Sequence, residues 1–295
     1  MTMPDDTARG LMPDLGVNGG QPEGHPVHAP GSATDAPAKV SRAGRNLPAA
    51  IGVGLLLGLF VILCLFWRRE LFIVLATSAV CIGVWELVEA LKHADVKVPL
   101  VPTVLGTVAM LVSAFFAGSE ALLVTFALTC VLILLWRGSD GARGAAADVT
   151  SGFFVAAYPG LIAGFSMLML APQDGAWRVF TFLAVTVASD IGGYAVGVLV
   201  GRHPIAPKIS PKKSWEGFAG SVGFCAVVGV GCVVYTLGGA WWVGLALGVV
   251  VAIAATIGDL IESTIKRDLR IKDMSRILPG HGGILDRLDS LILAA

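Results

Sequence analysis

Charged side chains are unusually scarce in this sequence. Asp, Glu, Lys and Arg make up 14% of its 295 residues, whereas about 25% is usual in soluble globular domains. Because 55% of the residues are hydrophobic and the mean hydropathy is +0.79, we expect a protein of the lipid bilayer. The 21 basic and 21 acidic residues cancel to a formal net charge of zero. The chain therefore lacks the basic excess of a nucleic-acid-binding domain, and no nucleic-acid partner is expected.

Clustered cysteines and phosphate-binding glycine loops are also missing. The cysteines lie singly inside apolar runs, with no Cys-x-x-Cys or Cys/His pattern: Cys64, Cys81, Cys130, Cys225 and Cys232. This spacing argues against a disulfide framework and favours small hydrophobic residues that are buried or face lipid. The stretch "GSDGARG" lacks the Lys-Ser/Thr pair of a phosphate loop. The 37 glycines are better explained by close helix packing.

The first 46 residues have almost no aromatic residues and no long apolar run. They are rich in Pro, Gly, Asp and Ala, so they cannot bury enough apolar surface to offset their ordering entropy. We predict a disordered cytoplasmic tail over 1–46, which is not a signal peptide because no apolar stretch follows a short basic start. Residues 47–150 are predicted as N-terminal transmembrane helices, and residues 151–295 as a C-terminal transmembrane catalytic region.

Long apolar runs fill the rest of the chain. A helix needs about 20 mainly apolar residues to cross a bilayer. Eight such runs are present: 48–67, 71–91, 99–117, 121–136, 151–170, 179–201, 218–237 and 240–262. A ninth apolar run begins near residue 283. We predict an all-α, polytopic integral membrane protein with about eight to nine transmembrane helices.

The basic residues between these runs are distributed unevenly. If the N-terminus is cytoplasmic and the spans alternate, 17 Lys and Arg residues lie inside, and 3 lie outside: Arg68, Arg69 and Arg178. Arg287 is set aside because it falls in the last helix. The positive-inside rule therefore predicts a cytoplasmic N-terminus. It also places the two longest polar links, 202–217 and 263–282, on the cytoplasmic side, so we expect the active site there.

The eighth run ends in a polar stripe. On a helix its polar residues fall at i, i+3, i+4 and i+7, which is one face: Asp259, Glu262, Ser263 and Lys266. An amphipathic exit from the membrane gives such a stripe by default. An interfacial helix end usually shows basic anchors first, however, and here an acid lies nearest the membrane. We therefore predict a functional role for Asp259.

A second acidic pair opens the last apolar run, in "LDRLDS". Asp286 and Asp289 are three residues apart, so both lie on one helix face. The helix dipole explains one aspartate at a helix start, but two carboxylates that share a site repel unless a cation lies between them. With Asp259 from the preceding helix end, they are typical oxygen ligands for Mg²⁺. The intervening "KRDLRIKDMSRILPGHGG" adds basic residues and a helix start whose amides could bind phosphate.

Two upstream stretches extend this predicted site. The link "RHPIAPKISPKKSWEG" contains Ser210, Lys212 and Lys213, which form either a phosphate clamp or an ordinary positive-inside loop with an interfacial Trp. The sixth run contains Asp190. An acid inside a membrane span is a functional hypothesis by default, although Asp190 could instead pair with a neighbouring helix.

The stretch from Ser263 to Ser290, "SxxKRxxxxKDxxxxLPGHGGxLDRxDS", closely resembles the C-terminal signature of the phosphatidate cytidylyltransferase (CDP-diacylglycerol synthase) family. "SDIGGYAVG" and "SPKKSWEG" resemble its two upstream motifs, in the same order. The resemblance covers about residues 150–295 and implies an all-helical, dimeric membrane enzyme. Such an enzyme would convert CTP and phosphatidate to CDP-diacylglycerol and pyrophosphate for phospholipid synthesis, with Mg²⁺.

The resemblance also implies roles for individual residues. Asp259 and Asp286 match the metal-binding acids, and the sequence leaves open whether a monovalent cation shares the site. Asp289, Lys266 and Arg267 match further signature positions. The two basic residues would neutralise phosphates together with Lys212 and Lys213, and Asp289 would orient a ligand water or Arg287. The remaining residues assigned to substrate binding are Asp190, Ser210, Ser263, His281 and Arg287; His281 would shape the glycine turn or touch phosphate.

Other functions stay open at this point. A related membrane nucleotidyl- or phosphotransferase could act on another lipid, such as a polyprenol. An ion-coupled transporter could use Asp190, Asp259 and Asp286 as an ion path, although we find no internal repeat and the charges cluster at one face. The expected location is the cell membrane, with multiple passes and the lipid bilayer as a permanent partner.

Overall fold

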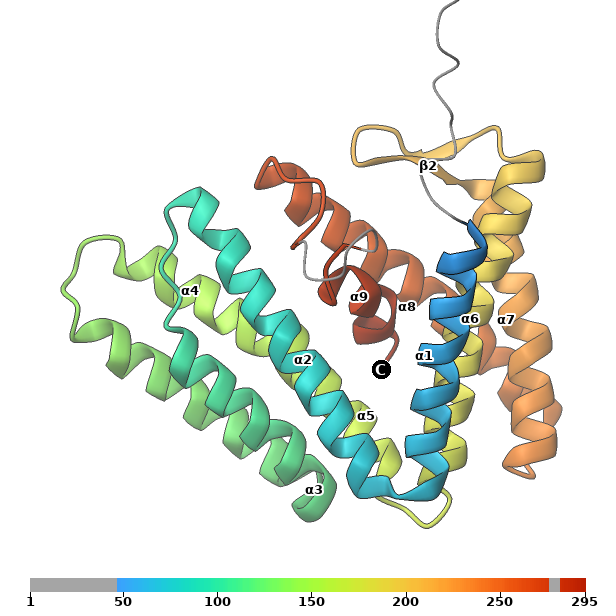
Figure 1. The fold of residues 1–295 in the computed structure, drawn as a ribbon, viewed down its shortest axis with the longest axis horizontal. Coiled ribbons are helices and arrows are strands. Elements are labelled where there is room, and N and C mark those ends of the chain that lie inside the picture. Colours follow the sequence, from blue (N-terminus) through green and yellow to red (C-terminus); the bar gives the residue numbers. More distant parts are fainter. Residues whose placement is uncertain (1–46, 276–281) are drawn as a thin grey trace, which may run out of the picture. The chain divides into compact units, whose positions relative to one another are not determined.

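The computed structural model describes residues 47–275 and 282–295, and it is mostly helical (Figure 1). Within these residues the helices are α1 (Leu47–Trp67), α2 (Arg69–Leu91), α3 (Leu100–Gly138), α4 (Ala145–Val155), α5 (Ile162–Leu170), α6 (Gly175–Val200), α7 (Trp215–Thr236), α8 (Trp241–Asp268) and α9 (Leu285–Ala294). The described residues form one compact unit. The predicted tail lies outside the described residues, and the predicted domain boundary at 150, which falls inside α4, stays a prediction.

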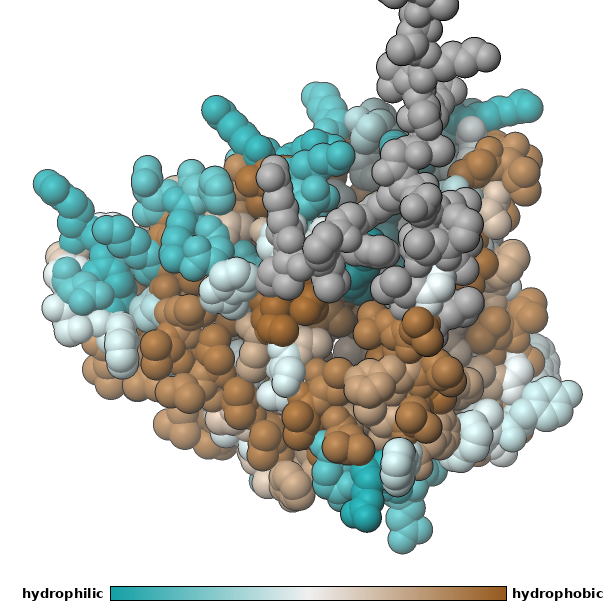
Figure 2. All heavy atoms as spheres, in the orientation of Figure 1, coloured by the Kyte–Doolittle hydropathy of each residue, from teal (hydrophilic) through white to brown (hydrophobic). Residues whose placement is uncertain are grey.

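Six helical segments of the described chain are long and apolar enough to cross a membrane: 69–94, 100–138, 145–170, 175–200, 215–236 and 241–268. In α1 the described apolar stretch, Leu56–Trp67, is shorter. Figure 2 shows a broad band of hydrophobic residues between more hydrophilic ends. The protein is therefore a helical, multi-pass membrane protein, as predicted.

The longest helix, α3, is a hairpin of two helical arms. Gly118 interrupts it with φ 82° and ψ −167°, a conformation that residues with a side chain rarely adopt. The arms lie side by side, because the hydroxyls of Ser113 and Thr125 are 3.1 Å apart. A Cβ at Gly106 would lie 2.2 Å from the Thr129 side chain. The arms correspond to the predicted runs 99–117 and 121–136, which we expected to be separate spans.

The fifth predicted run is longer than expected and contains a wide turn. It starts at Ala145, and α4 and α5 are joined by a π-helical turn, η2 (Ala156–Leu161), that contains Pro159. Proline cannot donate a helix hydrogen bond, and a π turn is one way in which a helix accommodates such a residue. Together the pieces form one apolar segment, 145–170.

The three helices α6, α7 and α8 pack closely through glycines. A Cβ at Gly220 of α7 would lie 2.7 Å from the carbonyl oxygen of Gly192 in α6. A Cβ at Gly244 of α8 would lie 2.5 Å from the carbonyl oxygen of Gly229 in α7. These contacts confirm that small residues allow helix backbones to approach. The five cysteines are free, as expected.

The link 202–217 differs from the all-α expectation. It forms an antiparallel hairpin of β1 (Pro204–Ala206) and β2 (Ser210–Ser214), and Ser214 then caps α7 by accepting a hydrogen bond from Gly217 N–H at 3.1 Å. Glu216 closes the hairpin by accepting bonds from the N–H groups of Arg202 and His203. Apolar and polar residues do not alternate in this stretch, so the sequence carries no signal from which the strands could be predicted.

The basic residue that begins α2 also has a local explanation. Arg69 donates hydrogen bonds to the carbonyl oxygens of Pro172, at 2.7 Å, and Gln173. These two residues link α5 to α6. Arg69 therefore joins two turns at the end of the molecule opposite the hairpin (Figure 1), which accounts for a basic residue on the side predicted to be poor in them.

Candidate active site

Segments that are far apart in the sequence meet at the hairpin end of the molecule. The Lys213 ammonium forms an ion pair with the Asp259 carboxylate, which joins β2 to α8. Arg267 Nε donates to the carbonyl oxygen of Ile209 at 3.3 Å. The two long polar links therefore lie at the same end, as predicted. Arg267 is exposed and contacts the hairpin backbone; its proposed contact with phosphate stays a prediction.

A polar cavity of about 230 Å³ lies beside the Lys213–Asp259 pair. Four predicted site residues from α6, β2 and α8 line it: Asp190, Lys212, Lys213 and Asp259. The hydroxyl-bearing residues Ser221 and Thr256 also line it, and the sequence analysis did not identify them. Ser210 lies at the far end of β2, opposite Ala206, and is not among the described residues that form this lining. The cavity brings two cations and two carboxylates together in a space suited to phosphate groups.

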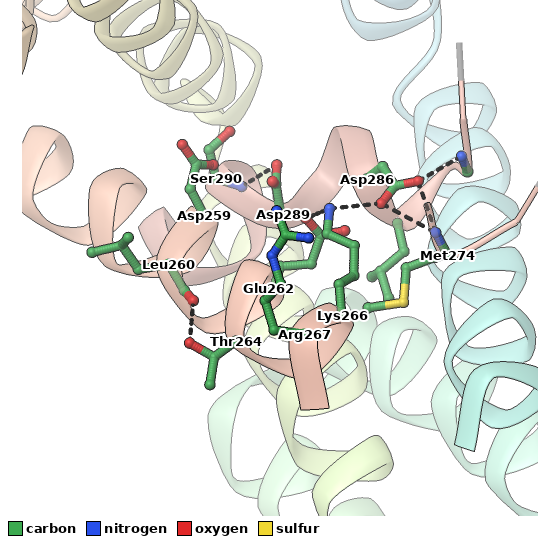
Figure 3. A network of polar contacts seen from close by, with 12 residues as sticks. Asp259, Leu260, Glu262, Thr264, Lys266, Arg267, Met274, Asp286, Asp289 and Ser290 are labelled. Atoms are coloured by element: carbon green, nitrogen blue, oxygen red, sulfur yellow. Dashed lines mark hydrogen bonds and ion pairs between the residues drawn. The ribbon is translucent and has the colours of Figure 1, made fainter. Parts of the chain in front are cut away.

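A second charged group lies between α8 and α9 (Figure 3). Lys266 Nζ lies 2.6 Å from Glu262 Oε2 and 3.0 Å from Asp286 Oδ1. Glu262 is only 1% exposed, and in the described part of the chain its other oxygen, Oε1, is buried with no hydrogen-bond partner. A buried carboxylate oxygen in this state is costly, so a cation or a donor group would fit beside it.

Asp286 is bound by the backbone as well as by Lys266. Its Oδ2 accepts hydrogen bonds from the N–H groups of Met274 at 3.1 Å and Gly283 at 2.8 Å. Burial alone would raise the pKa of Asp286, but the neighbouring Glu262 carboxyl, the Gly283 N–H and the Lys266 ammonium outweigh it and hold that pKa below its ordinary value. Asp286 is therefore an ionised carboxylate that ties α9 to the residues that follow α8.

Asp289 lies where α9 crosses α8. A Cβ at Gly258 would lie 2.5 Å from the carbonyl oxygen of Asp289, so glycine permits this close approach. In Figure 3 the Asp289 side chain lies between those of Asp259 and Asp286. Burial, followed by the charges of Asp259 and Glu262, raises the pKa of Asp289 to about 10. Carboxyl groups that share a buried space in this way hold a proton or a cation between them.

The donor chemistry of this region fits a hard divalent cation, since carboxylate oxygens are the ligands that Mg²⁺ prefers. The buried Oε1 of Glu262 and the raised pKa of Asp289 point the same way. Asp259 and Asp286 are, however, each paired with a different lysine. Over residues 47–275 and 282–295, no three His, Cys, Asp or Glu side chains are grouped to hold a metal ion. Metal binding by these aspartates therefore stays a prediction.

The start of α9 differs from the prediction of an open phosphate site. The N–H of Gly283 donates to Asp286, and those of Ile284 and Leu285 donate to Glu86 of α2. Carboxylates already occupy these amides, so the expectation was wrong for them. Sequence analysis missed Glu86, although an acid inside the apolar run 71–91 carries the same signal that singled out Asp190.

Three predicted site residues remain. Ser263 is half-buried on α8. Arg287 lies on α9 at an apolar cavity of about 450 Å³ that α1, α2, α5 and α6 also line. His281 lies outside the described residues. Nothing in the structure tests the individual functions of these residues.

Comparison with known proteins supports the resemblance. Residues 48–295 match the sequence model of the cytidylyltransferase family. A phosphatidate cytidylyltransferase from Mycobacterium leprae is 40% identical over 270 residues, which cover 86% of each chain. One from Mycobacterium tuberculosis is 37% identical over 287 residues, 92% of this chain and 88% of its own. One from Helicobacter pylori is 42% identical over 139 residues, about half of each chain.

Proposed function

The chain belongs to the cytidylyltransferase family, and we propose that it transfers the cytidylyl group of CTP to phosphatidate, giving CDP-diacylglycerol and pyrophosphate. One observation carries this proposal: relatives named phosphatidate cytidylyltransferase match most of the chain at 37–40% identity. The meeting of lysines and carboxylates at one end of an apolar bundle suits a reaction between a nucleotide and a lipid phosphate.

The chemistry requires little acid–base work. A phosphatidate phosphate oxygen attacks the α-phosphorus of CTP; the new P–O bond forms, and the bond to the β-phosphate oxygen breaks. The attacking oxygen is already an anion, so no strong general base is needed. The site must bring two polyanions together and stabilise the leaving pyrophosphate, which is mainly positioning and charge neutralisation.

The chain's own residues divide this work. Lys212 and Lys213, which line the polar cavity, bind phosphate oxygens there. Lys266 supplies a further positive charge between α8 and α9. Asp259 and Asp286 would hold Mg²⁺, which would supply further neutralisation of phosphate charge. Lys213, which pairs with Asp259 at the edge of the polar cavity, is placed to bind a substrate phosphate there.

In this proposal the site lies on the cytoplasmic side of the cell membrane. The excess of Lys and Arg in the links at this end of the molecule supports that orientation, by the positive-inside rule. CTP then arrives from the cytoplasm, and phosphatidate enters from the adjacent leaflet. A homodimer follows from the family resemblance alone.

The test supplies purified protein with labelled CTP, Mg²⁺ and a panel of lipid phosphates. We expect a CDP-lipid with phosphatidate, equimolar pyrophosphate, and loss of both products when EDTA replaces Mg²⁺. A product formed only with another lipid would replace phosphatidate as the substrate. Cation flux through vesicles with no CDP-lipid from any substrate would favour a transporter and overturn the proposal.

A further inference from the structure

A glutamate from the first half of the chain reaches the start of the last helix. Glu86 lies in α2, within a segment apolar enough to cross a membrane, and it has 0% exposure. A buried carboxylate is costly unless hydrogen bonds satisfy its oxygens. Its retention inside an apolar helix therefore needs specific partners.

The partners of Glu86 that the structure describes are two amides at the start of α9 and the hydroxyl of Ser275, which follows α8 in the chain. Oε1 accepts hydrogen bonds from the Ile284 N–H at 2.9 Å and from the Ser275 hydroxyl, and Oε2 accepts from the Leu285 N–H at 2.7 Å. The first amides of a helix have no partner within the helix. The N-cap residue, Ile284, has no side chain that could satisfy them. Glu86 caps α9 from another helix, about 200 residues away in sequence.

The glycine before α9 makes this approach possible. A Cβ at Gly283 would lie 2.7 and 2.8 Å from the two carboxylate oxygens of Glu86, closer than real Cβ contacts. Any larger residue there would push Glu86 away from the amides. The same glycine donates its N–H to Asp286, so Glu86 and Asp286 bind adjacent amides of a single turn.

We propose that Glu86 is a positioning residue for cytidylyl transfer: by capping α9 it sets the place and register of that helix, and so aims Asp286 and Asp289 at α8. Glu86 does not line the polar cavity, so it acts through the aspartates. This inference rests on the proposed roles of those two residues. It assigns a specific contribution to α2, which lies outside the region of the signature motifs.

The first test compares Glu86→Gln, Glu86→Ala and Gly283→Ala in detergent. Gln keeps the shape but only one acceptor oxygen, so we expect kcat to fall about tenfold; Ala leaves both amides unsatisfied and should lower kcat by up to about 100-fold. KM for CTP should change less than about threefold, because Glu86 does not touch the cavity. Gly283→Ala breaks the same contact from the other side and should reproduce the loss.

Hydrogen–deuterium exchange of peptides supplies a readout that does not depend on activity. The first turn of α9 should exchange at least about tenfold faster in Glu86→Gln, while α6 and α7 keep wild-type protection. Glu89→Gln is the matched control, because Glu89 lies on the same helix, but its side chain is 39% exposed and pairs with Lys92. Val80→Ala, a buried apolar truncation in α2, controls for general destabilisation.

Any of three outcomes would overturn the proposal. The first is unchanged exchange of α9 in all three variants, and the second is faster exchange of α9 with wild-type kcat. The third is a kcat loss that Val80→Ala reproduces at equal Tm. If wild-type protein itself makes no CDP-lipid, the proposed function fails instead, and the exchange data still report whether Glu86 holds α9.

Discussion

The two lysine–carboxylate groups of the site are held differently. The Lys213 and Asp259 side chains are 26% and 24% exposed at the edge of the polar cavity. The Lys266, Glu262 and Asp286 side chains are 18%, 1% and 11% exposed, and two backbone N–H groups also bind Asp286. The first pair can exchange partners with an arriving ligand at low cost, whereas the second is part of the framework between α8 and α9.

The difference in burial between the two groups affects what the loss of one partner costs. Partly exposed ion pairs contribute little to stability, about 0–1 kcal/mol. Removal of one partner from a buried group costs much more, about 3–5 kcal/mol, because it leaves an uncompensated charge. Substitutions in the first pair should therefore act mainly on substrate and metal binding. Substitutions in the second should also act on the folded state.

The largest expected effect is on turnover. Asp259→Asn and Asp286→Asn should each lower CDP-lipid formation by about 100- to 1,000-fold, since each removes a charge proposed to hold Mg²⁺. Only Asp286→Asn should also lower the Tm in detergent, because it alone weakens bonds to the backbone. Near-normal turnover in either variant would defeat the metal assignment, and an equal loss of Tm would erase the contrast between the pairs.

The lysines should separate binding from stability. Lys266→Ala leaves Glu262 and Asp286 without their cation and should reduce the free energy of unfolding by about 3–5 kcal/mol. Lys213→Ala should leave stability within about 1 kcal/mol of wild type and raise KM for CTP. Thermal unfolding and steady-state kinetics on both variants check this prediction. Greater instability in Lys213→Ala would reverse the assignment of framework and exchangeable pair.

Asp289 should make stability depend on pH. Its folded pKa is raised to about 10 from about 3.9 in an unfolded chain, so between these values the folded state binds more protons. Stability then falls as pH rises through this window. Asp289→Asn removes the effect, and its Tm relative to wild type should increase from about pH 5 to pH 9 without divalent cations. A parallel pH dependence in the two proteins would show that Asp289 is not a buried, proton-holding group.

The smallest effect is expected for the tail. Deletion of residues 1–46 should leave kcat and KM within about twofold of wild type, because the family match begins at residue 48 and the tail composition predicts disorder. The same CTP assay on the truncated protein checks this. A severe loss of turnover would show that the tail contributes to catalysis.

Much of the architecture could be read from local patterns. Apolar runs of about 20 residues predict spans because an unsatisfied backbone in hydrocarbon is too costly, and the structure confirms most of their positions. The polar stripe from Asp259 to Lys266 and the pair Asp286–Asp289 follow from helix periodicity alone. The hairpin of β1 and β2 could not be predicted, because its strands are short and lack alternation.

Contacts between distant segments could not be predicted from local sequence patterns. The 3.6-residue period places Lys266 and Glu262 on one face, but it does not reveal that Asp286 joins them 20 residues later. Likewise, "PGHGG" indicates a helix start, and nothing local indicates that Glu86 of α2 accepts hydrogen bonds from the N–H groups of Ile284 and Leu285, which follow it. Which carboxylate accepts which N–H depends on how helices cross, and a single sequence does not report that.

Hydropathy and helix periodicity are properties of short segments, so they establish the class of protein, the approximate spans and the residue types gathered for phosphate chemistry. The pairing of each lysine with its aspartate, the burial of Glu262 and Glu86, and the capping of α9 from α2 follow only from the packing of the helices. Those features arise when distant helices bury polar groups together, and each buried group must then find its partner in the packed arrangement.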